Sequence, residues 1–222
     1  MRNNVSGSIN TELNITTIID KLAKKRPIFH SEADIQHAFA WEIHEQYPLA
    51  TVRLEVPSHR EDKKEHIDIW IKYNDKIHAI ELKYKTRKID VTHLEETFYL
   101  LNHYAQDWGR YDFLKDIVRL ESFNVIGYAI MLTNDDRYWQ KGRRATIDTA
   151  FRIHEGRTIE GTLTWGENAA EGTTRGRTDP LQLRGIYSLQ WRDYSNLQEA
   201  GPNQFRCLVL KVLRQQNLLQ QE

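Results

Sequence analysis

The stretch HIDIWIKYNDKIHAIELKYKTRK, residues 66–88, decides the fold, because apolar and polar residues alternate through both of its halves. A period of two is that of a β-strand, whose successive side chains point to opposite faces. Asn74 and Asp75 lie between the two alternating runs and favour the tight turn of a two-residue hairpin. We therefore predict a β-hairpin, with strands too apolar for the exposed edge of a sheet.

The register of this hairpin brings acidic residues together. Counting outward from a turn at positions 74 and 75 places Asp68 directly opposite Glu81, with Lys83 on the same face. Facing carboxylates repel each other, so a fold that keeps them needs a shared proton or a cation. Mg²⁺ prefers carboxylate oxygens and can polarise a bound water for hydrolysis, and Lys83 could assist that water or stabilise the transition state. The alternative is a solvated hairpin face with cross-strand ion pairs, which the apolar strands disfavour.

Asp68 followed by Glu81-Leu82-Lys83 resembles the signature of the PD-(D/E)XK nuclease superfamily. The resemblance covers about residues 28–135 and implies an α/β, restriction-endonuclease-like fold, with a central mixed β-sheet flanked by helices. It implies that Asp68 and Glu81 bind Mg²⁺, for which Mn²⁺ substitutes, and that Lys83 is catalytic. The family often adds a glutamate from its first core helix, and Glu32 matches it; the alternative is a first-turn acid favoured by the helix dipole. No proline precedes Asp68, which departs from the family pattern.

Helices and strands are expected around the hairpin in the order of that fold. A short helix precedes Pro27, and Ser31 opens a second helix that ends near Pro48. Residues 51–56 alternate as a strand. A long helical region is predicted from Thr92, with a break near Gly109 and a continuation to residue 123, followed by a buried strand at 124–132.

The last third of the chain has a different residue pattern and is expected to be rich in β-strands. We predict a hairpin around Glu155-Gly156, a long loop at residues 165–180, and closing strands at 185–194 and 204–213. The resulting division is a lead-in with a short helix (1–27), a nuclease-like core (28–135), and a C-terminal β-rich elaboration packed on the same domain (136–222). The end of the chain is expected to be a frayed tail.

Composition bounds the class of protein. The 222 residues contain no apolar run that could span a membrane and no signal peptide, and Cys207 is the single cysteine, which favours a reducing cytoplasm. Lysine plus arginine and aspartate plus glutamate both number 31, so any nucleic-acid site must be a local patch. Lys85, Arg87 and Lys88 are the predicted phosphate contacts, or else a solvated strand end.

The functional expectation is therefore a metal-dependent nuclease, most simply a DNA endonuclease. RNA as the substrate and a catalytically inactive nucleic-acid-binding or protein-interaction domain of the same fold are the alternatives. The last third resembles the specificity or dimerisation additions of such nucleases, which makes a homodimer an option. The histidines lack the spacing of a zinc site. Gln106 and Tyr111 have the wrong spacing for the glutamine-tyrosine motif found in part of the superfamily.

Overall fold

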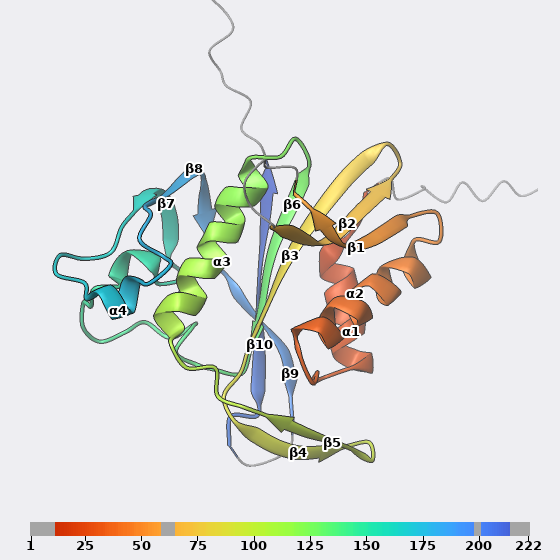
Figure 1. The fold of residues 1–222 in the computed structure, drawn as a ribbon. Helices are drawn as coiled ribbons and strands as arrows, with labels where there is room; N and C mark the ends of the chain where they lie inside the picture. The colour runs from red at the N-terminus through yellow and green to blue at the C-terminus, as the bar shows by residue number, and fades with distance from the viewer. Residues whose placement is uncertain (1–11, 59–64, 198–200, 214–222) are drawn as a thin grey trace, which may run out of the picture.

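The computed structural model describes residues 12–58, 65–197 and 201–213. Its centre is a six-stranded mixed sheet with helices on both faces (Figure 1), which confirms the predicted α/β class. The strands lie in the order β1-β2-β3-β6-β10-β9, and only β3 and β6 are parallel neighbours. The predicted frayed tail at residues 215–222 and the lead-in before residue 12 lie outside the described residues.

The elements have the following bounds. The central sheet consists of β1 (Thr51–Pro57), β2 (His66–Tyr73), β3 (Lys76–Lys85), β6 (Ile126–Thr133), β9 (Trp191–Asn196) and β10 (Gln204–Leu213). Two smaller sheets consist of β4 (Ile89–His93) with β5 (Glu96–Leu100), and β7 (Thr158–Leu163) with β8 (Leu181–Ser188). The helices are α1 (Ile15–Lys25), α2 (Glu32–Gln46), α3 (Gln106–Glu121), the short α4 (Glu171–Thr174) and the 3₁₀ turn η1 (Thr149–Phe151).

The β2-β3 hairpin has the predicted register. Its pairs run from Tyr73–Lys76 to Ile69–Ile80. The two turn residues at positions 74 and 75 have φ angles of 47° and 59°, as a type I′ turn requires. Strand β1 pairs with the outer edge of β2, and β6 pairs with the outer edge of β3. Both strands of the hairpin are therefore internal to the sheet.

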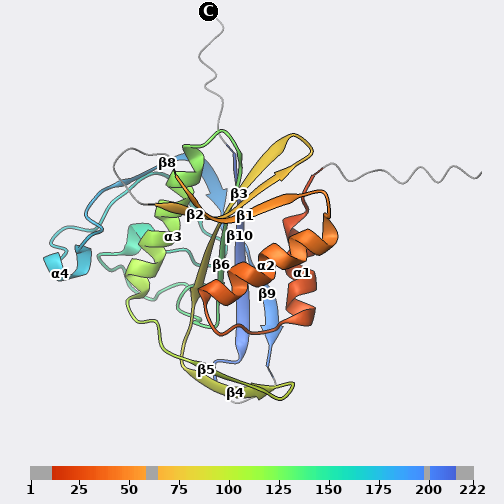
Figure 2. The ribbon, with the colours of Figure 1, turned by 45° about the vertical axis from the view of Figure 1, so that its right-hand side comes forward.

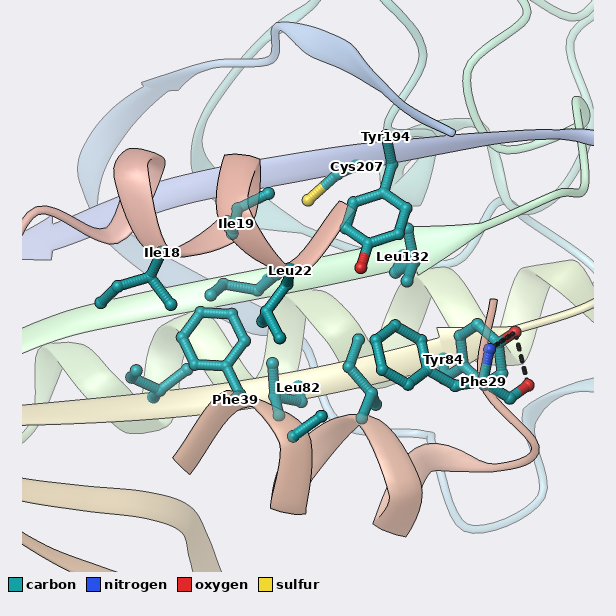
Figure 3. Close-up of a cluster of buried hydrophobic side chains, with 14 of the residues drawn as sticks. Ile18, Ile19, Leu22, Phe29, Phe39, Leu82, Tyr84, Leu132, Tyr194 and Cys207 are labelled. Carbon is teal, nitrogen blue, oxygen red and sulfur yellow. Dashed lines mark hydrogen bonds between the residues drawn. The ribbon is translucent and has the colours of Figure 1, made fainter. Parts of the chain in front are cut away.

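Helices α1 and α2 cover one face of the sheet and bury the apolar side of the hairpin (Figures 1 and 2). The buried side chains between these helices and the sheet form a hydrophobic cluster. Leu82 and Tyr84 of β3 project into it beside Leu22 and Phe39 (Figure 3). The Tyr84 hydroxyl donates a hydrogen bond to the Phe29 carbonyl at 2.9 Å, just before α2 begins. This contact holds the N-terminus of α2 beside the C-terminal end of β3.

Helix α3 covers the opposite face of the sheet (Figure 2). Its apolar stripe, with Phe113, Ile117 and Leu120, is buried against Ala129 and Met131 of β6. The helix therefore runs over the face on which the polar side chains of β3 project. No described helix is long and apolar enough to span a membrane.

The predicted helix from Thr92 is wrong in its first half. Residues 89–100 form the β4-β5 hairpin, with turn residues Leu94 and Glu95 at φ 47° and 67°. Phe98 and Leu100 are buried while Tyr99 is exposed, a period of two that the helix-favouring run at residues 94–96 concealed. The predicted break at Gly109 is also wrong, because α3 passes through it unbroken.

The last third differs from its prediction as well. Strand β7 pairs with β8 across the long loop rather than with residues before Glu155-Gly156, where η1 lies instead. The predicted strand at 185–194 is divided between β8 and β9, which belong to different sheets. Because β10 pairs with β6 along its length, the expected boundary at residue 135 runs through the central sheet. Long-range strand pairing of this kind leaves no local sequence pattern.

Candidate active site

The candidate site begins where β2 and β3 separate. Regular pairing stops at Ile69–Ile80, so the predicted facing pair of Asp68 and Glu81 lies just beyond the ladder. Asp68 replaces the missing backbone contact with its side chain, because its Oδ2 accepts a hydrogen bond from the Leu82 N–H at 2.6 Å. The Asp68 carbonyl accepts another from the Gln36 side chain at 2.7 Å. The strands thus open at the predicted acidic residues.

Glu81 is the most deeply buried member of the predicted site, with 1% of its surface exposed. Its Oε2 lies 2.6 Å from Nη2 of Arg119 on α3. Neither carboxylate oxygen has a partner in hydrogen-bond geometry among the residues that the structure describes, so the Arg119 contact is an ion pair only. A buried carboxylate with so little hydrogen bonding is costly unless another ligand reaches it.

Helix α3 supplies two charged residues that the sequence reasoning missed. Asp116 lies 2.6 Å from the Lys83 ammonium and 2.8 Å from Arg119. Asp116 follows Phe113 by three residues and precedes Leu120 by four, so it belongs to the buried stripe of the helix. The predicted helix up to residue 123 already included this carboxylate beside its apolar stripe, which is the signal that the sequence carried.

The side chains of Asp68, Glu81, Lys83, Asp116 and Arg119, called here the acidic cluster, contain more acidic than basic groups. Asp68, Glu81 and Asp116 contribute three carboxylates, against two cations from Lys83 and Arg119. Burial and, after it, the Asp116 charge raise the pKa of Glu81 to about 9, against the lowering effect of Arg119. Burial also raises the pKa of Asp68 to about 6, against the lowering effect of Lys83. The pair therefore favours a proton or a cation, as facing carboxylates do.

Lys83 is held as a cation. Burial by itself lowers its pKa, but the charges of Asp116, Glu32 and Asp68 outweigh burial and the net shift is upward. The side chain is 16% exposed and its ammonium also donates to the Leu82 carbonyl. A lysine with a raised pKa provides positive charge at neutral pH and does not accept a proton.

Glu32 lies at the rim of the cluster. Its Oε2 accepts a hydrogen bond from the Tyr84 N–H at 2.7 Å, and the residue is exposed. Its charge raises the pKa of both Lys83 and Asp68, which places it within electrostatic reach of them. The structure thus brings Glu32 to the C-terminal end of β3, beside the predicted catalytic residues.

The predicted phosphate contacts lie on the same end of the hairpin. Lys85 is the last residue of β3 and lines a cavity of about 380 Å³ with Glu32 and Tyr99. Arg87 lies beyond the strand, 3.3 Å from Asp136, and Lys88 is exposed. Only the first of the three therefore belongs to the strand itself.

The remaining sequence candidates lie elsewhere. Gln106 donates to Asp135, and the Tyr111 hydroxyl donates to the Asp179 carbonyl. Cys207 is buried in β10, and burial raises the pKa of its thiol to about 12. Within residues 12–58, 65–197 and 201–213, no three His, Cys, Asp or Glu side chains are grouped so as to hold a metal ion. Any ion at the acidic cluster would thus rely on two carboxylates and water.

Comparison of the chain with family models, with curated proteins and with solved structures found no significant match.

Proposed function

We propose that this chain is a Mg²⁺-dependent nuclease that hydrolyses phosphodiester bonds, most simply a DNA endonuclease, with its active site at Asp68, Glu81 and Lys83. The observation that carries the proposal is the buried Glu81 carboxylate, which lacks hydrogen bonds beside a second carboxylate and a lysine cation. Glu32 is the fourth proposed member of the site.

The order of the elements supports a restriction-endonuclease-like fold. Helix α2, the β1-β2-β3 meander, helix α3 and strand β6 follow one another in the order that the proposed superfamily implies. The parallel pairing of β3 with β6, with α3 as the crossover, fits the same arrangement. The proposed site lies on the two central strands of this unit.

The residues present fit a magnesium ion. Within the described residues, Asp68 Oδ1 makes no hydrogen bond and Glu81 Oε1 has no partner, so each carboxylate keeps one free oxygen. Mg²⁺ is commonly held by one or two carboxylates and several waters. When bound, the ion supplies a polarised water as the nucleophile and charge stabilisation at the phosphate.

The other side chains orient this site. Asp116 holds the Lys83 ammonium at 2.6 Å and keeps it protonated, so Lys83 would stabilise negative charge that develops on the phosphate. Arg119 contacts both Glu81 and Asp116 and fixes the carboxylates relative to the helix. Asp116 and Arg119 are therefore positioning residues.

A nicking assay tests the proposal. The wild-type protein should convert supercoiled plasmid to nicked or linear forms with Mg²⁺ or Mn²⁺ and should be inactive in EDTA. A parallel assay on a structured RNA separates the two substrate classes. Binding of DNA or RNA without cleavage under any metal condition would overturn the nuclease proposal in favour of an inactive binding domain.

A further inference from the structure

A second charged site lies apart from the acidic cluster, beside the N-terminal half of α3. It is a cavity of about 290 Å³ formed by α3, residues 137–143 and residues 152–154. Of the described residues that line it, none is an aspartate or a glutamate. The basic residues around this cavity, called here the cationic pocket, are Arg110, Arg137, Lys141, Arg143, Arg152 and His154.

The positive charge of the cationic pocket is only partly neutralised. Asp148 lies 2.6 Å from Arg110, and Asp135 lies 2.7 Å from Arg137. In the described part of the chain, no carboxylate lies within ion-pair distance of the other cations, Lys141, Arg143 and Arg152. Five permanent cations against two acids leave an excess of three positive charges, in a chain whose formal net charge is zero.

Neutral groups hold Arg152 of the pocket in place. The Arg152 guanidinium donates to the Arg144 carbonyl at 2.7 Å and to the Thr146 hydroxyl at 2.9 Å. Gly142 packs so closely against Arg152 that a Cβ at this glycine would collide with the guanidinium. Because neither partner carries charge, the side chain is positioned while its charge stays available to an anion.

Two buried polar atoms at the pocket lack partners. Within the described residues, Arg110 Nε and His154 Nδ1 make no hydrogen bond. Burial lowers the pKa of His154, and the surrounding charges of Arg157, Lys141 and Arg152 lower it further. A place where cations repel a further proton is a place that favours an anion.

We propose that the cationic pocket binds a phosphate group, and that the phosphate belongs to the nucleic-acid strand. Guanidinium groups match phosphate oxygens in geometry as well as charge. Arg110 precedes Asp116 by six residues on α3, about 9 Å along the helix axis. This separation is short enough for one strand to reach both places, with its scissile phosphate at Lys83 and a neighbouring phosphate at the pocket. The nucleic-acid source rests on the proposed nuclease function, whereas the phosphate site rests on the pocket alone.

Charge reversal with a matched control tests this proposal. Lys141→Glu/Arg143→Glu changes two exposed residues of the pocket, and Lys72→Glu/Arg184→Glu makes the same charge change at exposed positions that do not line it. Fluorescence anisotropy with labelled single-stranded DNA in EDTA should show binding weakened at least about tenfold by the first variant only. Its plot of log affinity against log salt should be shallower by about 0.7, the slope for one lost phosphate contact on a single strand. Equal weakening in both variants, or in neither, would overturn the proposal.

A small probe separates the phosphate site from its source. Pyrophosphate added to ¹⁵N-labelled protein should shift the amide resonances of Gly142 and His154 in the wild type and not in the pocket variant. No shift would overturn the phosphate site. A shift without binding of DNA or RNA would support the site and overturn the nucleic-acid source. Tighter binding of 5′-phosphorylated than of 5′-hydroxyl DNA would assign the pocket to a strand end, and equal binding to an internal phosphate.

Discussion

The acidic cluster and the cationic pocket both consist of charged residues, but they differ in burial and in how far their charges are compensated. The acidic cluster is buried between β3 and α3, where Lys83 and Arg119 partly offset its three carboxylates. The cationic pocket is open, and its uncompensated charges come from a segment outside the central sheet. A formal net charge of zero thus conceals a cluster of paired acids and bases and a separate pocket with an excess of positive charge.

Because the two charged sites lie apart, the zero net charge of the chain does not argue against binding of nucleic acid. From composition alone, a neutral chain is a poor candidate for binding nucleic acid. With the charges located, the neutral total is compatible with one site that attracts a metal cation and another that attracts phosphate. Variants that alter one site and leave the other unchanged distinguish catalysis from binding.

The largest expected effect comes from Glu81→Gln, which removes one charge from the acidic cluster and keeps its shape. Cleavage of plasmid with Mg²⁺ should fall by at least about a hundredfold, because a free carboxylate oxygen of the proposed metal site is lost. Binding of DNA in EDTA should be unchanged. Glu160→Gln, at an exposed position on β7, is the control and should cleave normally. Full activity in Glu81→Gln would exclude Glu81 from the site.

Lys83→Ala should slow cleavage by about a hundredfold, the scale for losing one electrostatic stabiliser. The variant should still bind Mn²⁺, since Asp68 and Glu81 remain. Lys72→Ala, a lysine exposed on the neighbouring strand, serves as the control. Loss of metal binding together with activity would mean that Lys83 holds the cluster together instead of acting on the phosphate.

Asp116→Asn should have a smaller effect, about ten- to a hundredfold on the cleavage rate, because Asp116 acts through Lys83 and Arg119. Its absence should also lower the pKa of Lys83 and Glu81, whose pKa values the Asp116 charge raises. The pH dependence of cleavage measures this. A reduced rate with an unaltered pH profile would indicate a merely structural residue.

The smallest expected effect is on stability against pH. The pKa of Glu81 is raised from 4.5 to about 9 on folding, so its contribution to stability is present at low pH and lost as pH rises toward 9. Glutamine carries no charge at any pH. In EDTA, Glu81→Gln should therefore gain stability relative to the wild type between pH 5 and pH 9, by at least about 1 kcal/mol, the equivalent of one pKa unit. Denaturant unfolding measures the difference in the free energy of unfolding. No gain at pH 9 would contradict the raised pKa of the buried Glu81 carboxyl.

The sequence predicted those parts of the fold and the site that depend on residues close together along the chain. The β2-β3 hairpin was predicted in register, because the alternation and the Asn74-Asp75 turn are local features. Its three polar residues were identified for the same reason. The β4-β5 hairpin was missed because the run Leu94-Glu95-Glu96 favours a helix, although its first two residues form the turn between two short strands.

The partners on α3 were missed for a related reason. Asp116 and Arg119 meet Glu81 and Lys83 only because the crossover places α3 against β3, and sequence separation gives no sign of that contact. The cationic pocket joins Arg110 to residues 137–154 in the same way. The clustering of Arg143 with Arg152 likewise has no local signal in the sequence.

Titration of the protein with Mn²⁺ by isothermal calorimetry tests the central claim most directly. The wild type should bind Mn²⁺ at the acidic cluster, and Asp68→Asn and Glu81→Gln should each weaken binding at least about tenfold, the usual scale for loss of a group that supports a metal site. The pocket variant Lys141→Glu/Arg143→Glu should bind the metal as the wild type does. No binding by the wild type, or equal binding by the wild type and both acidic-cluster variants, would contradict the assignment of a metal to Asp68 and Glu81.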